Sequence, residues 1–450
     1  MSVVAGDTAW VLVSAALVMF MTPGLAIFYG GLVRSKHVLA TIAQSIVALA
    51  VVSVTWVVIG YTLAFGKDAG GLIGDLGHVG FAGVGADPSA WAPTVPASAF
   101  ATFQLMFAVI TPALITGAVA ERLRFGAYVA FLVAWSVLVY APVAHWVWGG
   151  GFLGASGIGA LDFAGGAVVH VNAGAAALAA IVFVGRRRGY PQAAFVPHNV
   201  PFVVLGAGIL WFGWFGFNAG SALTSGGVAA GAFLATQLAA ATAMLTWIGL
   251  ERLRHRHAST IGAATGAVAG LVAVTPAAGY VTPLAALGIG VVAGAVCFGA
   301  VELKHRLRFD DSLDVVGIHL VGGVVGALLT GVLASAAVNP AGVDGGLVQV
   351  ARQFAAVAVS GAFSFTMTLA ILAVIDRVVP VRVAADDEDT GLDATQHGET
   401  AYSLGERAGV WRATTDGFDA DEELRTLREQ IVTEATRRTI EALREPSPLD

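Results

Sequence analysis

Long apolar runs alternate with short polar connections along most of the chain. Each run is close to the roughly 20 residues that an α-helix needs to cross a bilayer. The first is too long for a cleaved signal peptide and lacks a basic leader. The pattern predicts an all-α polytopic membrane protein with 11 transmembrane helices. Their approximate limits are 10–33, 39–65, 98–120, 125–147, 163–185, 200–218, 227–250, 259–276, 281–300, 314–336 and 350–376.

Basic residues cluster after the odd-numbered runs and are almost absent after the even-numbered ones. Cytoplasmic connections carry the excess of Lys and Arg, so this alternation predicts an N-terminus outside the cell and a C-terminus inside. The clusters are Arg34 and Lys36, Arg122 and Arg124, Arg186 to Arg188, Arg252, Arg254 and Arg256, Lys304, Arg306 and Arg308, and Arg377 and Arg382. Topology explains these short basic loops, and we expect no nucleic-acid partner.

The composition agrees with a membrane protein. Of the 450 residues, 57% are hydrophobic and 12% are charged, whereas soluble domains carry about 25% charged residues. The single cysteine, Cys297, excludes a disulfide scaffold and a cysteine-based metal site. We expect neither a metal nor a cofactor.

The composition changes near residue 384, which predicts a transmembrane domain at 1–383 and a cytoplasmic tail at 384–450. The tail begins with the acidic segment AADDEDTG. A rough apolar stripe among charges then predicts an amphipathic helix near 419–445. This helix could dock on the membrane domain, associate with itself, bind a partner, or remain a solvated helix of minor effect.

Two of the apolar runs contain the same polar pattern. Asp–x7–His–x3–Gly occurs at Asp162, His170 and Gly174, and again at Asp311, His319 and Gly323. The copies lie five spans apart, an odd number, so they cross the membrane in opposite directions. This arrangement predicts a 5+5 inverted repeat with one extra helix, a design in which transport folds place their pathway at the repeat interface.

The spacing places both histidines deep in the membrane. Eight helical residues advance roughly 12 Å, so His170 and His319 approach the midplane from opposite sides. Ionisable groups at that depth usually mark a pathway. The alternative is that each histidine only hydrogen-bonds to a neighbouring helix and holds the bundle together, and the symmetric depth favours the pathway. Asp162 and Asp311 are expected to cap helix N-termini, and Asp162 could also attract a cation from outside.

Seven segments resemble the ammonium transporter (Amt/Rh) family, and two of them, WFGFNAGSA and HGETAY, favour its Amt branch. The segments are TPGLAIFYGGLVRSK (22–36), ITPALITGAVAERLRF (110–125), VAHWVWGGG (143–151), ALDFAGGAVVHVNAG (160–174), PHNVPFVVLGAGILWFGWFGFNAGSA (197–222), DVVGIHLVGG (314–323) and GLDATQHGETAYSL (391–404). The resemblance implies a homotrimer in the plasma membrane, with one pore for ammonium or ammonia in each subunit and methylammonium as an analogue.

The resemblance also implies roles for particular residues. An outer substrate site matches Phe107, Trp148 and Ser221, with Gln104 one helical turn before Phe107. A gate matches the stacked Phe107 and Phe217, and a pore beyond it matches Trp214, His170 and His319. The sequence departs from the family at Leu320, where glycine is usual, and this change could alter packing or pore width beside His319.

These residue types suit ammonium. Aromatic faces attract a cation by about 2 kcal/mol when desolvated, and a serine hydroxyl can accept a hydrogen bond from it. Tryptophan also gathers at membrane interfaces regardless of function. A π face attracts potassium as well, so the narrow passage must discriminate. Ammonium can release a proton and continue as neutral ammonia past neutral imidazoles, a form that burial favours, whereas potassium cannot lose its charge.

Two further classes of function can be weighed against the sequence. Residues 405–450 extend beyond the family segments, so an ammonium sensor that signals through the tail is the main alternative. An enzyme is not expected, because Asp162 and Asp311 are predicted at opposite membrane faces and no HExxH, GxSxG or P-loop motif occurs. Conduction of carbon dioxide or urea is a conceivable side activity. GLDATQHGETAY resembles the family segment that contacts PII-type nitrogen-regulatory proteins, which implies such a partner at the cytoplasmic face.

Overall fold

The computed structural model describes residues 2–402, 429–430, 432–433 and 436. The chain divides into two compact units, Met1–Ala401 and Tyr402–Asp450. Most of the amphipathic helix predicted at 419–445 lies outside the described residues. The described ones within it, 429–430, 432–433 and 436, are helical.

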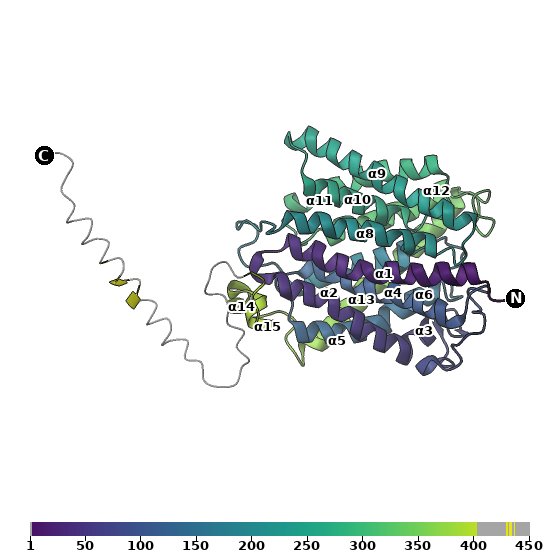
Figure 1. Cartoon of the computed structure of the whole chain (residues 1–450), viewed down its shortest axis with the longest axis horizontal. Coiled ribbons are helices and arrows are strands. Elements are labelled where there is room, and N and C mark those ends of the chain that lie inside the picture. The colour runs from purple at the N-terminus through teal and green to yellow at the C-terminus, as the bar shows by residue number, and fades with distance from the viewer. Residues whose placement is uncertain (1, 403–428, 431, 434–435, 437–450) are drawn as a thin grey trace. The chain divides into compact units, whose positions relative to one another are not determined.

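Helices form nearly all of the regular structure of the first unit (Figure 1). Within the described residues, one short antiparallel hairpin also occurs, made of β1 (Asp68–Ala69) and β2 (Ile73–Gly74). The α-helices are α1 (Ala5–Leu32), α2 (Val38–Thr55), α3 (Tyr61–Phe65), α4 (Ala97–Ile115), α5 (Phe125–Trp135), α6 (Ala141–Val147), α7 (Asn172–Val184), α8 (Val200–Gly220), α9 (Gly227–His255), α10 (Thr260–Val274), α11 (Pro283–Leu307), α12 (Val321–Leu333), α13 (Leu347–Asp376), α14 (Ala385–Thr390) and α15 (Leu392–His397).

Turns of other helical geometry join these helices. The 3₁₀ turns are η1 (Ser35–His37), η3 (Val79–Phe81) and η4 (Thr116–Val119). The π-helical turns are η2 (Trp56–Gly60), η5 (Ser136–Tyr140), η6 (Gly166–Val171) and η7 (Val316–Leu320). π-helical turns are rare in proteins overall, but where they occur they are often at functional sites. Here, η6 and η7 contain the two predicted pore histidines.

The predicted spans coincide closely with helices. In the described part of the chain, 10 helical segments are long and apolar enough to cross a membrane. The predicted span at 259–276 contains α10, which is also apolar but has only 15 residues.

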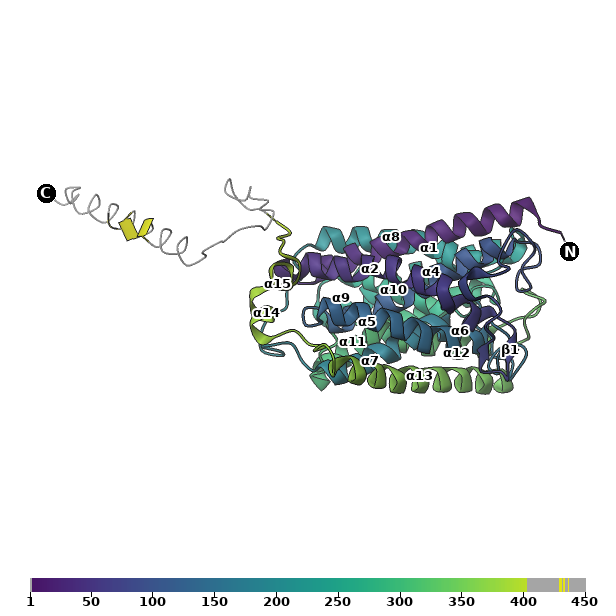
Figure 2. The same ribbon diagram turned by 90° about the horizontal axis from the view of Figure 1, so that it is seen from below.

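The helices of the first unit run side by side in both views (Figures 1 and 2). Helix α1 packs along α8, α9 packs with α10 and α11, and α13 packs on α7. The N-terminus lies at one end of the bundle, and α14 and α15 lie at the other. Helix α4 and the η6–α7 segment are central, because 83% of the most apolar part of each is buried, against 28% in α13.

Small residues allow this close packing. Gly206 of α8 faces the backbone of Phe28 in α1, and a Cβ added to Gly206 would lie 2.4 Å from the Phe28 nitrogen. In lipid, packing rather than hydrophobicity joins helices. A larger residue at Gly206 would therefore separate α1 from α8.

A buried ionic network ties together the loops at the end of the bundle near α14. Arg187 pairs with Asp310 at 2.7 Å, and Arg34 pairs with Glu121 at 2.7 Å. Although burial opposes it, hydrogen bonding from Arg187 holds the pKa of Asp310 below its ordinary value. Removing one partner of such a pair leaves an uncompensated buried charge, which is strongly destabilising.

The beginning of the predicted tail packs against the helix bundle. Glu388 accepts a hydrogen bond from the Arg188 backbone N–H at 2.6 Å and pairs with Arg382 at 2.9 Å. Asp393 accepts from the Ala40 N–H at 2.9 Å. Because of these contacts, the limit of the compact unit at Ala401 does not coincide with the predicted boundary at residue 383.

Candidate functional site

An aromatic cavity lies on one side of the predicted gate. It has a volume of roughly 220 Å³, and its walls include Gln104, Phe107, Trp148 and Ser221. The structure therefore brings together all four residues of the predicted outer site. Further aromatic rings, including that of Trp91, complete the walls.

Hydrogen bonds orient two of these side chains. Trp148 directly follows α6, and its indole N–H donates to the carbonyl oxygen of Asp162 at 2.8 Å. Ser221 directly follows α8, and its hydroxyl donates to the carbonyl oxygen of Phe217 at 2.8 Å. The hydroxyl hydrogen of Ser221 is thus committed, so its oxygen is left as an acceptor for a donor such as ammonium.

Gln104 supplies a second acceptor. Gln104 is 8% exposed, and its side chain lines the cavity. Its Oε1 has no hydrogen-bond partner among the described residues. An unpaired buried carbonyl oxygen is costly, and an N–H donor in the cavity would relieve that cost.

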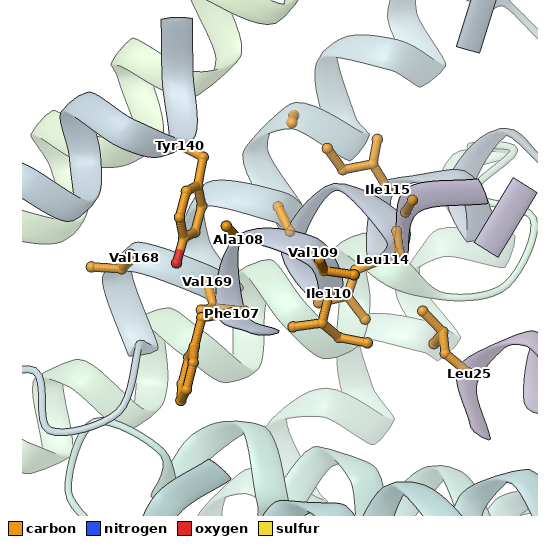
Figure 3. Close-up of a cluster of buried hydrophobic side chains, with 14 of the residues drawn as sticks. Leu25, Phe107, Ala108, Val109, Ile110, Leu114, Ile115, Tyr140, Val168 and Val169 are labelled. Carbon is orange, nitrogen blue, oxygen red and sulfur yellow. The ribbon is translucent and has the colours of Figure 1, made fainter. Parts of the chain in front are cut away.

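The predicted gate residues are two rings in contact. The ring centroids of Phe107 and Phe217 lie 4.3 Å apart, and both side chains are 1% exposed. Trp148 meets Phe107 edge to face at 5.9 Å. In Figure 3, Phe107, Ile110 and Leu114 follow one another along α4, and Ile110 and Leu114 line the passage beyond the gate.

This passage is narrow and almost entirely apolar. A cavity of about 20 Å³ lies among Phe217, Trp214, His170 and His319, with apolar side chains such as Leu25 around it. A cavity needs about 10–15 Å³ to hold one water molecule, so this cavity holds one small molecule. The structure thus brings the predicted pore residues together.

The two imidazoles form a directly hydrogen-bonded pair. Nδ1 of His170 lies 3.2 Å from Nδ1 of His319, and the rings are nearly parallel, with centroids 5.3 Å apart. The side chains are 1% and 5% exposed. The His170 ring also stacks on Trp214 at 5.5 Å. The rings face each other and the passage, as a shared role in conduction requires.

The two motif copies contact each other reciprocally. A Cβ added to Gly174 would lie 2.4 Å from the nitrogen of Leu320, which follows His319. A Cβ added to Gly323 would lie 3.1 Å from the nitrogen of Val171, which follows His170. Each motif glycine therefore lets the other copy approach, and this approach brings the histidines within hydrogen-bonding distance.

Leu320 takes part in this packing and does not line the passage. Its side chain packs against a cluster that contains Val171 and Val357.

The two aspartates cap the histidine-bearing segments. Asp162 accepts four backbone N–H bonds of 2.6–3.1 Å, from residues 165–168. Asp311 accepts two, from Val315 at 3.1 Å and Val316 at 2.7 Å. Burial raises the pKa of both carboxyl groups, to about 7 for Asp311. Asp162 does not line the outer cavity, and its carbonyl oxygen reaches that cavity only through Trp148.

Some residues of the site carry no obvious signal in the sequence. Thr275 contacts both His170 and Trp214 through its hydroxyl oxygen. Leu25, Tyr29 and Ile110 line the passage, but apolar positions that face a pore look like those that face lipid. The threonine in an otherwise apolar run was the one available hint.

The fold and this site define a polytopic membrane protein with a narrow interior passage for one small solute. The model of the Ammonium Transporter Family matches residues 9–402. The ammonium transporter of Mycobacterium tuberculosis is 49% identical over 437 residues, which cover 90% of this chain and 91% of that protein. The chain belongs to the Ammonium Transporter Family and is a multi-pass protein of the cell membrane.

Solved structures agree with this assignment. The crystal structure of Saccharomyces cerevisiae Mep2 is similar at a TM-score of 0.80 and 38% identity, covering 85% of this chain and 88% of that one. A structure named Sensor Amt Protein is similar at a TM-score of 0.80 and 29% identity, covering 87% and 98%. The predicted helical, polytopic fold and the predicted family are therefore confirmed.

Proposed function

We propose that this protein transports ammonium by binding it in the outer cavity, removing a proton near the Phe107–Phe217 gate and passing ammonia along the histidine-lined passage. The observation that carries the proposal is the directly bonded imidazole pair beside a passage of about 20 Å³. A passage of this size admits a single small molecule without a hydration shell.

The outer cavity suits the charged form of the substrate. The faces of Phe107 and Trp148 attract a cation, and the oxygens of Ser221 and Gln104 are available to accept its N–H bonds. Both kinds of contact favour ammonium over ammonia. The cavity therefore concentrates substrate in the form that predominates near neutral pH.

The passage suits the neutral form. Moving a full charge through apolar surroundings costs several kcal/mol at least, and potassium cannot reduce that cost. Ammonium avoids it by releasing a proton, and the imidazoles then offer ammonia hydrogen-bond partners. The released proton follows separately from the ammonia, so selectivity comes from the chemistry of the substrate rather than from its size.

The membrane topology belongs to the same proposal. We place 11 helices across the bilayer, with α10 as a short crossing, the N-terminus outside and the C-terminus inside. The reciprocal contacts of Gly174 and Gly323 support a 5+5 inverted repeat with α13 as the extra helix. Residues 384–450 then face the cytoplasm, and labelling of single cysteines introduced at each end of the bundle tests this orientation.

A homotrimer and a PII-type regulator complete the proposal. Both follow from the family resemblance, the second from the GLDATQHGETAY segment, part of which forms α15. Light scattering of the detergent-solubilised protein tests the trimer. Co-purification of the host's PII protein with a form that lacks residues 384–450 would count against regulation through the tail.

An ammonium sensor is the second candidate, favoured by the similarity to the structure named Sensor Amt Protein. Deleting residues 405–450 separates the two functions. Loss of nitrogen-dependent gene expression with unchanged uptake would indicate a sensor, whereas transport alone predicts no such loss.

The principal test is the ammonium-evoked current of the purified, reconstituted protein, measured together with uptake of labelled methylammonium. We expect saturable methylammonium uptake and an ammonium-evoked current, and no current when potassium replaces ammonium. Absence of uptake in vesicles that contain correctly folded protein would refute the proposal.

A further inference from the structure

We propose that Thr275 fixes the protonation pattern of the histidine pair and leaves Nε2 of His319 as the one ring nitrogen of that pair that can accept a proton from the passage. This inference rests on the proposed function, because it specifies how the pair handles the proton that ammonium releases. It assigns Thr275 a positioning role, since the residue does not line the passage and acts on the substrate through His170 and Trp214.

The hydroxyl hydrogen of Thr275 is already committed. Thr275 directly follows α10 and is fully buried. Its Oγ1 lies 2.7 Å from the carbonyl oxygen of Leu271. A carbonyl oxygen has no hydrogen to give, so the hydroxyl must be the donor in this bond. The Thr275 oxygen can therefore only accept from its other neighbours.

Two nitrogens face that oxygen. The indole Nε1 of Trp214 lies 3.0 Å away and can only donate. The imidazole Nε2 of His170 lies 3.3 Å away. Because Thr275 has no second hydrogen to give, Nε2 of His170 must carry the hydrogen of this bond.

The pattern then extends to the second histidine. A neutral imidazole has one N–H, so Nδ1 of His170 carries a lone pair. It lies 3.2 Å from Nδ1 of His319, which must donate. Nε2 of His319 is therefore unprotonated, and it has no hydrogen-bond partner among the described residues. His319 also lines the passage, so this lone pair is the one that ammonia or a proton can reach.

This arrangement prevents a proton from passing beyond His170. A proton accepted at Nε2 of His319 allows the Nδ1 hydrogen of that ring to move to Nδ1 of His170. The charge then resides on His170, whose Nε2–H stays bonded to the Thr275 oxygen. Thr275 cannot pass a proton onward, because its own hydrogen points at the Leu271 carbonyl. The proton must leave by reversal through Nε2 of His319.

Two variants of Thr275 separate positioning from packing. Thr275→Val keeps the branched shape and removes the hydroxyl, whereas Thr275→Ser keeps the hydroxyl and removes a methyl group. The full-length protein is labelled with ¹⁵N-histidine and reconstituted in lipid bilayers. Solid-state NMR then reports which ring nitrogens carry hydrogen, with signals assigned by their loss in His170→Gln and His319→Gln.

We expect the wild type to show His170 protonated at Nε2 and His319 protonated at Nδ1. Thr275→Ser should keep this pattern, and Thr275→Val should give a mixture of tautomers. A wild-type spectrum with His170 protonated at Nδ1 would overturn the proposal, and so would an unchanged pattern in Thr275→Val. Because the wild-type spectrum is decisive by itself, the test does not depend on the folding of a variant.

Transport provides the second readout. Thr275→Val removes the hydrogen bonds of both His170 and Trp214 to the hydroxyl oxygen. One neutral hydrogen bond of ordinary strength corresponds to a change of roughly fivefold, so Thr275→Val should lower the maximal rate of methylammonium uptake by at least about that factor. The half-saturating concentration should not change, because Thr275 does not line the outer cavity. Thr275→Ser should transport as the wild type does. An unchanged rate in Thr275→Val with altered tautomers would show that conduction does not use the pattern. Absence of uptake in the wild type would instead refute the proposed function, and the spectrum would still decide the tautomers.

Discussion

The two copies of the Asp–x7–His–x3–Gly motif have the same spacing but different surroundings. Asp162 accepts four backbone N–H bonds, and Asp311 accepts two. Among the described residues, His170 has a partner at both ring nitrogens, whereas His319 has one at Nδ1 alone. The first copy is thus held by more hydrogen bonds and lies next to the outer cavity, whereas the second leaves Nε2 of His319 available. A repeated sequence pattern has acquired two different tasks because its neighbours differ.

The largest effect should come from removing the two caps. Asp162→Ala leaves four buried N–H groups without an acceptor, whereas Asp311→Ala leaves the buried N–H of Val315 and the partly buried N–H of Val316. Each unsatisfied buried group costs about 1–3 kcal/mol, so we expect a loss of several kcal/mol for Asp162→Ala and about half of that for Asp311→Ala. Thermal unfolding of the two variants in detergent at pH 6 shows which variant loses more stability. Equal losses would show that the copies are equivalent anchors.

The Asp311 cap should also make stability depend on pH. Burial raises the pKa of Asp311 from 3.8 to about 7. A raised carboxyl pKa gives a stability contribution that is present at low pH and is lost as pH rises through the folded value. The thermal midpoint of the wild type should therefore fall between pH 5 and pH 8 by several degrees more than that of Asp311→Asn. Identical pH profiles for these two proteins would contradict the assigned pKa.

Substrate affinity should depend on the outer copy through Trp148. Trp148→Leu removes a cation–π contact of about 2 kcal/mol, so the half-saturating methylammonium concentration should rise roughly 30-fold. Gln104→Leu removes one acceptor of about 1 kcal/mol, and a rise of roughly fivefold is expected. Trp148→Phe keeps an aromatic face but loses the bond to Asp162. An affinity of Trp148→Phe as weak as that of Trp148→Leu would show that the bond matters more than the ring.

The sequence predicted the helices of this molecule well because membrane helices have a simple physical requirement. A bilayer demands long apolar runs, and each predicted span contains a helix. The spacing of Asp162 and His170 also indicated a capped helix with an interior histidine. The short α10 was not distinguished from a full span, because hydropathy does not show where a helix ends when the following residues are also apolar.

The finer geometry of the site depends on contacts between distant segments. The π-helical turns η6 and η7 that hold the histidines have no local sequence signal. The bonds from Trp148 to the Asp162 carbonyl and from Thr275 to His170 join residues whose proximity only the fold creates. Likewise, α14 and α15 looked like the start of a tail, because composition does not reveal that Glu388 and Asp393 have partners in the helix bundle.

The central claim is that the imidazole pair restricts the passage to a solute that can lose a proton. The most direct measurement compares the wild type with His170→Ala/His319→Ala in proteoliposomes, recording currents evoked by ammonium and by potassium together with methylammonium uptake. We predict that the wild type excludes potassium, and that the double variant conducts it, because the widened passage admits a cation that keeps some water. Currents, uptake and potassium exclusion that match the wild type would contradict the account.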